Sequence, residues 1–246
     1  MKLRIDQLSI TFEQRKILDN IHLEIKEGEF VSLIGPSGCG KSTMLNILAG
    51  MLPCDEGRIF VDEKEIHGLS PHFAYMPQND LLLPWKNIID NVTLYARIHH
   101  KEKAMREQAI MELQRFGLAG YESAYPDQLS GGMRQRAAFL RTSLCEADIQ
   151  LLDEPFGALD VITRNDMQDW LLGMRSNIKK TTLLVTHDID EALYLSDRIV
   201  ILSSQPATIH KIIDVSSIQK SRDWLYGQGT LRKDIYQYLK GESHVI

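Results

Sequence analysis

The segment "GPSGCGKST", Gly35 to Thr43, constrains the fold more than any other part of the sequence. It fits the pattern G-x-x-x-x-G-K-[ST] and lies between a short apolar run, "GEFVSLIG", and a helix-like stretch, "STMLNILAGM". The apolar run is typical of a strand that is buried on both faces. A strand, a glycine-rich turn and a helix in this order begin a parallel α/β sheet. The alternative, a chance glycine-rich turn, does not require the flanking strand and helix, so the sequence predicts an α/β fold.

The residue types of this loop suit the binding of phosphate groups. Its glycines let successive backbone N–H groups face phosphate oxygens, and the helix dipole adds partial positive charge there. We expect Lys41 to reach the β- and γ-phosphates and the Ser42 hydroxyl to coordinate Mg²⁺. We expect the rest of the loop to bind the same ligand, Cys39 through its backbone alone: Gly35, Pro36, Ser37, Gly38, Cys39, Gly40 and Thr43. The loop therefore predicts a nucleoside triphosphate site.

Carboxylates follow a later apolar run, "IQLLDEP". An aspartate at the carboxyl end of a buried strand, Asp153, is placed to hold Mg²⁺. Glu154 comes next, and alternation along the strand would send its side chain to a different spot, where it suits a group that polarises the attacking water. The alternative interpretation of such a pair is a solvated turn.

Two further polar residues end short apolar runs. Gln78, in "YMPQND", could add an oxygen to the metal shell, and His187, in "LLVTHD", could hydrogen-bond a γ-phosphate. A glutamine or histidine at the end of a strand is more often structural. Their assignment to the site therefore depends on the wider pattern of motifs.

A second possible anion site lies far downstream, in "LSGGMRQR". One serine and two glycines come before a helix-like stretch, and the free N–H groups of a helix N-terminus favour negative charge. This stretch belongs to a helical region from Asn87 to about Cys145, which we interpret as a lobe inserted into the α/β core. The first thirty residues alternate apolar and polar, which is typical of antiparallel strands.

These patterns predict one domain over residues 1–246. We expect the α/β core, with the N-terminal antiparallel strands, to comprise residues 1–78 and 146–204. The inserted lobe then covers about 79–145, and 205–246 form a C-terminal tail with a short strand and a loosely helical end. A chain of this length suits one sizeable domain.

Composition excludes several classes of function. The net charge of −5 gives no basic field for nucleic acid. Three cysteines without ligand spacing predict neither disulfides nor a zinc site. The N-terminus lacks the apolar segment of a signal peptide, and no run reaches the roughly 18–20 apolar residues that span a bilayer. We therefore expect a cytosolic or peripheral protein.

Six motifs in order, "GPSGCGKST", "MPQ", "LSGGMRQR", "LLDEP", "GALD" and "LVTHD", carry a family resemblance. Together they resemble the ATP-binding subunit of an ABC transporter. The resemblance implies an ABC ATPase core of the P-loop NTPase class that hydrolyses ATP with Mg²⁺, in which Glu154 and His187 are catalytic and Gln78 helps to hold the metal. It also implies that Phe12 stacks on the adenine; a core position at the edge of a strand is the alternative.

The resemblance gives the second anion site a role. In this family the signature motif binds the nucleotide that is held by the other subunit of a head-to-tail dimer. The residues of this motif would therefore contact a partner's ATP: Ser130, Gly131, Gly132 and Gln135. By the same analogy, Ala158, Leu159 and Asp160 would lie at the dimer interface.

A finer resemblance concerns the stretches "NDLLLPWKNIIDNVTL" and "FGALDVITRNDMQ". They are similar to the nitrate, sulfonate and taurine branch of bacterial importers, which includes uptake systems for thiamine-precursor pyrimidines. In that branch the residues after the glutamine receive the membrane partner, here Leu82, Leu83, Pro84 and Trp85; packing of Trp85 into the helical lobe is the alternative. The resemblance implies a paired motor subunit at the cytoplasmic face of the membrane, bound to two permease subunits. An extracytoplasmic solute-binding protein would be an indirect partner, and nucleic acid would not be one.

Two other functions share the phosphate loop. A soluble ABC ATPase in DNA repair or translation usually carries long coiled-coil insertions or two ATP domains, and this chain has neither pattern. A P-loop kinase of a small metabolite has no use for "LSGGMRQR". The importer interpretation is therefore preferred, and the transported solute stays open.

Overall fold

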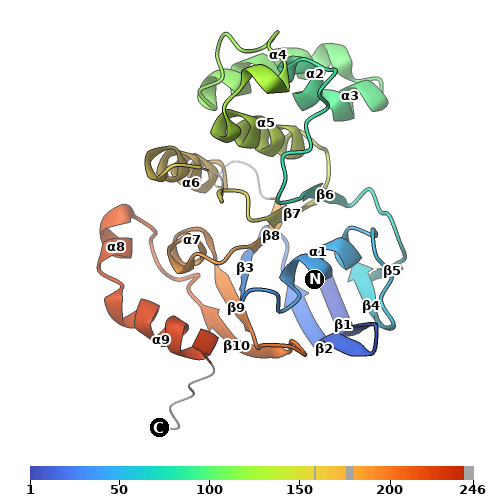
Figure 1. Cartoon of the computed structure of the whole chain (residues 1–246), viewed down its shortest axis with the longest axis vertical. Coiled ribbons are helices and arrows are strands. Elements are labelled where there is room, and N and C mark those ends of the chain that lie inside the picture. The colour runs from blue at the N-terminus through green and yellow to red at the C-terminus, as the bar shows by residue number, and fades with distance from the viewer. Residues whose placement is uncertain (158, 176–179, 241–246) are drawn as a thin grey trace.

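The strands of the protein form two sheets (Figure 1). The computed structural model describes residues 1–157, 159–175 and 180–240. The smaller sheet is antiparallel, in the order β2-β1-β4-β5. Its strands are β1 Leu3–Phe12, β2 Arg15–Ile25, β4 Glu56–Val61 and β5 Lys64–Ile66. This sheet contains the antiparallel N-terminal strands that the alternating pattern predicts.

The larger sheet has the order β10-β9-β3-β8-β7-β6 and is parallel except at its β10 edge. Its strands are β3 Phe30–Ile34, β6 Phe73–Met76, β7 Ile149–Asp153, β8 Thr181–Val185, β9 Arg198–Leu202 and β10 Ile209–Asp214. The mainly parallel sheet predicted from the short apolar runs is thus present. Because parallel strands end at one edge, the loops after β3, β7 and β8 come together there.

Each face of the larger sheet contributes to a different hydrophobic core. Along β3, Phe30 and Ile34 pack with the helical lobe, whereas Val31 and Leu33 pack with α1 (Lys41–Leu48) and the smaller sheet. This period of two follows from the alternation of side chains along a strand. The phosphate loop, between β3 and α1, is therefore fixed to a strand buried on both faces.

The helices between Asn87 and Cys145 form the green lobe at the top of Figure 1, away from the blue strands of the smaller sheet. They are α2 Ile88–Val92, α3 Leu94–Ile98, α4 Glu102–Arg115 and α5 Gly131–Ser143, with a short 3-10 helix at Pro126–Gln128. Aromatic packing joins the lobe to α6 (Val161–Arg175). The Trp170 ring lies 4.2 Å from that of Phe116 and 5.8 Å from that of Phe139, between ring centroids.

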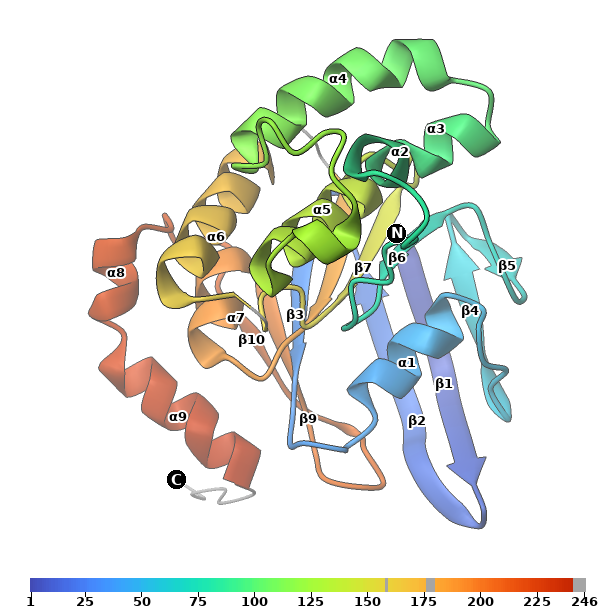
Figure 2. The same cartoon turned by 45° about the horizontal axis from the view of Figure 1, so that its top comes forward.

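The C-terminal region is more regular than the sequence indicates. After β10 come α8 (Arg222–Tyr226) and α9 (Gly229–Lys240), where the tail was expected to be only loosely helical. Both helices pack against α7 (Ile189–Leu195), and Figure 2 shows them on the side of the larger sheet away from β1 and β2. Ile235 of α9 is fully buried, so burial of an apolar face stabilises this helix. Within the described residues, we find no helix with the length and apolar character needed to cross a membrane.

Candidate nucleotide site

The phosphate loop requires glycine at the residue that caps α1. Gly40 has φ +118° and no side-chain cap. A Cβ atom there would lie 2.8 Å from the Leu18 side chain and 2.9 Å from that of Ile17, both on β2. An L-residue with a side chain therefore meets both backbone strain and a steric clash. The loop approaches β2 this closely because the residue lacks a side chain.

Lys41 is held at the base of the loop. It is only 7% exposed, and its Nζ donates hydrogen bonds of 2.9 Å to the Gly35 and Pro36 carbonyls. These bonds fix the ammonium group beside the loop that would receive the phosphates. The Cys39 thiol is buried, and burial raises its pKa, so it stays neutral. Cys39 is absent from the pocket lining, so its predicted backbone contact with the ligand stays a prediction.

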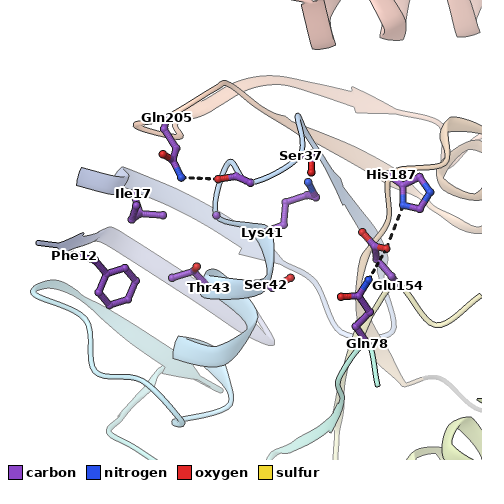
Figure 3. A pocket seen from close by; sticks show the side chains of 12 residues that line it. Phe12, Ile17, Ser37, Lys41, Ser42, Thr43, Gln78, Glu154, His187 and Gln205 are labelled. Atoms are coloured by element: carbon purple, nitrogen blue, oxygen red, sulfur yellow. Dashed lines mark hydrogen bonds and ion pairs between the residues drawn. The ribbon is translucent and has the colours of Figure 1, made fainter. Parts of the chain in front are cut away.

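A pocket of about 630 Å³ lies over this loop. In Figure 3, Phe12 and Ile17 stand at one end and Gln78, Glu154 and His187 at the other. Phe12 is 43% exposed, so it is not the core residue of the alternative interpretation. The remaining lining residues are Ser37, Gly38, Gly40, Lys41, Ser42, Thr43 and Gln205. The pocket thus joins an apolar end to a phosphate loop and a carboxylate.

Asp153 at the end of β7 suits a divalent cation. Its carboxylate is buried beside Ser42 and Tyr75, and its Oδ1 has no hydrogen-bond partner among the described residues. Burial, and then the neighbouring Glu154 charge, raise the pKa of Asp153. Burial and the nearby carboxylate also raise the pKa of Tyr75 to about 12. A cation bound between Asp153 and Ser42 would supply the missing partner, so these residues fit Mg²⁺.

Glu154 reaches the pocket through a backbone turn and not through simple alternation along the strand. It has φ +47°, a left-handed conformation that costs a non-glycine residue energy and is concentrated at functional sites. Its Oε2 accepts a 3.2 Å hydrogen bond from Gln78 Nε2 and lies 3.3 Å from His187 Nδ1. Figure 3 shows Glu154 between these two residues. The structure therefore brings together three predicted residues from the loops after β6, β7 and β8.

The second predicted anion site is exposed and separate from this pocket. Ser130 caps α5, where its Oγ accepts a hydrogen bond of 3.3 Å from the Met133 backbone N–H. Ser130 and Gly131 are exposed, and no residue of α5 lines the pocket. Gln135 does not share this surface, contrary to prediction. It is the fifth residue of α5, is buried and donates to the Pro155 carbonyl at 3.1 Å, because that side of the helix faces the core.

Comparison with known proteins identifies the family. A family model described as "ABC transporter" matches residues 18–157, which contain the phosphate loop, Gln78, Ser130 and both carboxylates. The chain belongs to the ABC transporter family. It is accordingly a transport ATPase, as the motifs predict.

The relatives of this ABC protein include named import subunits. The aliphatic sulfonates import ATP-binding protein SsuB of Bacillus cereus is 41% identical, over 87% of this chain and 86% of its own. The formylaminopyrimidine import ATP-binding protein ThiZ of Halalkalibacterium halodurans is 39% identical, over 98% of this chain and 97% of its own. Among solved structures, the ATP-binding cassette MJ0796, a dimer bound to ADP and phosphate, has a TM-score of 0.77 at 29% identity. The alignment covers 87% of this chain and 98% of the MJ0796 chain.

Two loops of the ABC protein carry the remaining predicted contacts. Of the predicted interface residues, Ala158 lies outside the described residues. Leu159 is largely buried and lies beside Gly132. A Cβ atom added at Gly132 would lie 3.3 Å from the Leu159 side chain. Asp160 is exposed, and its Oδ1 accepts hydrogen bonds from the backbone N–H groups of Ile162 and Thr163 at the start of α6.

The loop after Gln78 presents a different set of apolar side chains from the predicted one. Trp85 is 71% exposed, so it does not pack into the lobe. Pro84 is also exposed and Leu83 is partly buried, whereas Leu82 belongs to the core and Leu81 takes its place on the surface. The amide of the buried Asn91 explains this turn, because it bonds both the N–H and the carbonyl of Leu83.

The sequence analysis did not predict the residues that attach this loop to α5. From α5, Arg141 donates to the Asp80 and Leu81 carbonyls at 2.7 Å, and Arg134 Nε donates to Asp80 Oδ2 at 3.0 Å. It also missed Gln205, which lines the nucleotide pocket from beyond β9. These contacts join segments that are distant in the sequence, so no local motif reveals them.

Proposed function

We propose that this protein is the ATP-hydrolysing motor of an importer, and that two copies close around two Mg-ATP. The observation that carries the proposal is the division of the site. One surface holds a pocket lined by Lys41, Ser42 and Glu154, and another holds an anion site at Ser130 that the pocket does not use. A head-to-tail pair would bring Ser130 of one copy to the pocket of the other. The solved relative that is a dimer with ADP and phosphate supports this pairing.

The pocket residues have distinct proposed tasks. Mg-ATP, when bound, supplies the phosphoanhydride bond that is broken. The loop N–H groups and Lys41 would neutralise phosphate charge, and Asp153 and Ser42 would hold the cation. Glu154 Oε2 accepts a proton from water and orients it toward the terminal phosphorus. His187 and Gln78 lie 3.3 Å and 3.2 Å from Glu154, and their contacts fix the carboxylate in that orientation.

ATP binding and hydrolysis would then switch the pair of copies between a closed and an open state. The Ser130 site contacts only a triphosphate that is held by the partner, so its contact energy is present in the closed pair and lost after hydrolysis. A ligand shifts a conformational equilibrium through such differential contact. ATP binding would close the pair, and hydrolysis with loss of phosphate would reopen it.

We propose that this motion acts on a membrane permease through the loop at residues 81–85. Its exposed apolar side chains, Leu81, Pro84 and Trp85, are typical of a protein contact. Both import relatives act on small organic solutes by name, so we propose a small solute of the sulfonate or pyrimidine kind as cargo. The motor would then lie at the cytoplasmic face of the membrane, and an extracytoplasmic binding protein would deliver the solute.

A capture experiment tests this proposal. Tagged Glu154→Gln, which we expect to bind Mg-ATP but to hydrolyse it at least about a hundredfold more slowly, is captured in mild detergent from its native membrane. We expect a multi-spanning membrane protein at one copy per motor chain. Adding Trp85→Ala should release that protein, whereas Leu69→Ala, which truncates an exposed leucine between β5 and β6, should not. Capture of soluble proteins alone, or equal capture with Trp85→Ala, would contradict the importer or the docking loop, respectively.

A further inference from the structure

The loop between β9 and β10, residues 203–208, reaches the nucleotide pocket from the C-terminal half of the protein. Its Gln205 side chain lines the pocket beside the phosphate loop (Figure 3). None of the six motifs includes this loop. Its contribution must therefore be judged from its contacts.

Gln205 bonds the phosphate loop directly. Its Nε2 donates a hydrogen bond of 2.5 Å to the Gly38 carbonyl. Gly38 has φ +74°, and nothing lies within 4 Å of the position that a Cβ would occupy there. This part of the loop is thus held by hydrogen bonds and not by side-chain packing. On its other side, Cys39 N–H donates to the Pro36 carbonyl at 3.2 Å.

The loop that carries Gln205 is itself firmly anchored. The buried Ala207 forms two backbone hydrogen bonds with β2: its N–H donates to the Ile17 carbonyl at 2.8 Å, and its carbonyl accepts from Asp19 N–H at 2.9 Å. Ser203 closes the loop through backbone and side-chain bonds to Thr208. Gln205 therefore holds Gly38 from a fixed support.

The same support lies behind the next glycine of the phosphate loop. Ile17 and Leu18, the β2 residues that pair with Ala207, are the two that a Cβ at Gly40 would strike. We propose that Gln205 is a positioning residue for the nucleotide: with β2 behind Gly40, it fixes the outer side of the phosphate loop so that its inner N–H groups face the phosphates. This inference rests on the proposed binding of ATP phosphates by Gly35–Thr43.

The contact requires a donor at position 205. A carbonyl can only accept, so Nε2 must face Gly38, and Gln205 Oε1 is left buried without a hydrogen-bond partner among the described residues. Gln205→Met keeps the length of the side chain and removes the donor together with that unpaired oxygen. Gln205→Glu places an oxygen against the carbonyl and adds negative charge near the triphosphate. Gln205→Arg restores a donor.

The experiment measures the Kd of ATP, the kcat of hydrolysis and the unfolding temperature of each full-length variant. Loss of one neutral hydrogen bond predicts a Kd about two- to tenfold higher for Gln205→Met. Its kcat at saturating ATP should stay within about twofold, and its unfolding temperature without nucleotide should stay unchanged. Gln205→Glu should bind more weakly still, and Gln205→Arg should restore the wild-type Kd. Ser204→Ala, an exposed change on the same loop, is the matched control.

Inorganic tripolyphosphate has no adenosine, so its binding tests the phosphate loop without the other end of the pocket. If Gln205 acts through Gly38, Gln205→Met should weaken tripolyphosphate and ATP by the same factor. A loss confined to ATP would overturn the proposal, as would a lowered unfolding temperature with unchanged Kd. Lys41→Ala reports separately on the proposed site: normal ATP affinity in that variant would refute the assignment of the loop itself. If Lys41→Ala abolishes binding and Gln205→Met does not alter it, only the role of Gln205 fails.

Discussion

Helices α1 and α5 both begin at glycine-containing turns, and their surroundings differ. At the start of α1 the loop encloses a buried lysine, and Asp153 and Glu154 lie close by in the same region. At the start of α5, Ser130 caps its own helix, Gly131 is exposed, and no acidic residue lies in the first turn. Both ends favour an anion through free N–H groups and the helix dipole. Only the first lies beside the carboxylates that we propose to hold a cation and activate water.

The difference indicates that a helix start that favours anions can lie within a complete site or supply only one part of a site. The α1 turn is attached to a strand buried on both faces, whereas the α5 turn is attached, through Arg134 and Arg141, to the loop that exposes Trp85. A partner that moves this loop would therefore move Ser130 relative to the phosphate loop. We infer that the first region holds the nucleotide and that the second senses whether it is present.

The largest effect that would test this comparison comes from mixing two inactive variants. Lys41→Ala removes the lysine that we propose to bind phosphate, and Ser130→Arg blocks the proposed anion site at the start of α5. Each variant alone, in the assembled transporter, should lose hydrolysis by a factor of about a hundred or more. In a mixed pair, the intact phosphate loop of one copy meets the intact Ser130 of the other, which restores one of the two composite sites. We expect about half of wild-type ATP hydrolysis per mixed pair.

The mixed pair also shows how the comparison could be wrong. If each chain formed its site from its own Ser130, both copies in the mixture would stay inactive. A Ser130→Arg variant that hydrolyses ATP normally in the assembled transporter would equally remove the second helix start from the mechanism. Lys41→Ala alone, taken through the same mixing procedure, serves as the inactive control.

Replacing one glycine of each turn by alanine should change the free energy of unfolding, which is a smaller effect than the loss of hydrolysis. At Gly40, φ +118° and the close approach of Leu18 and Ile17 predict a loss of about 2–4 kcal/mol for Gly40→Ala. At Gly131 the nearest atom to an added Cβ is Arg134 Nη2 at 3.9 Å, so Gly131→Ala should leave stability unchanged or raise it by up to about 1 kcal/mol. Urea titrations of both variants measure the difference. Equal losses would mean that the α5 turn is as constrained as the α1 turn.

The sequence predicted much of this contrast because its motifs are local. The strand, turn and helix around Lys41 need only neighbouring residues, and so does the helix start at Ser130. The sequence did not predict the turn at Glu154, whose φ of +47° replaces simple strand alternation. It also did not reveal the burial of Leu82 or Gln135, because burial depends on which side of a loop or helix meets a distant element. The Gln205 contact joins residues 167 positions apart, beyond the reach of any pattern.

The smallest predicted effect concerns a hydrogen bond next to His187. His187 lines the nucleotide pocket. Thr186 Oγ1, next to His187, donates a hydrogen bond of 2.6 Å to the buried Glu191 carboxyl. Burial raises the pKa of Glu191 from its ordinary 4.5 to about 7, with the nearby Asp188 charge adding to the rise. The folded protein therefore binds this proton more tightly than the unfolded chain does. Its contribution to stability is fully present below about pH 4.5 and is lost as pH rises through 7.

Glu191→Gln removes this titration while its amide oxygen can still accept the Thr186 hydrogen bond. Relative to wild type, the variant should therefore gain about 1–3 kcal/mol in unfolding free energy between pH 5 and pH 8.5. Comparing the two proteins at each pH cancels the groups that titrate in both. Chemical denaturation at the two pH values measures the difference. A constant difference would mean that Glu191 is already ionised at pH 5, and that the attraction of Arg164, 3.9 Å away, outweighs its burial behind His187.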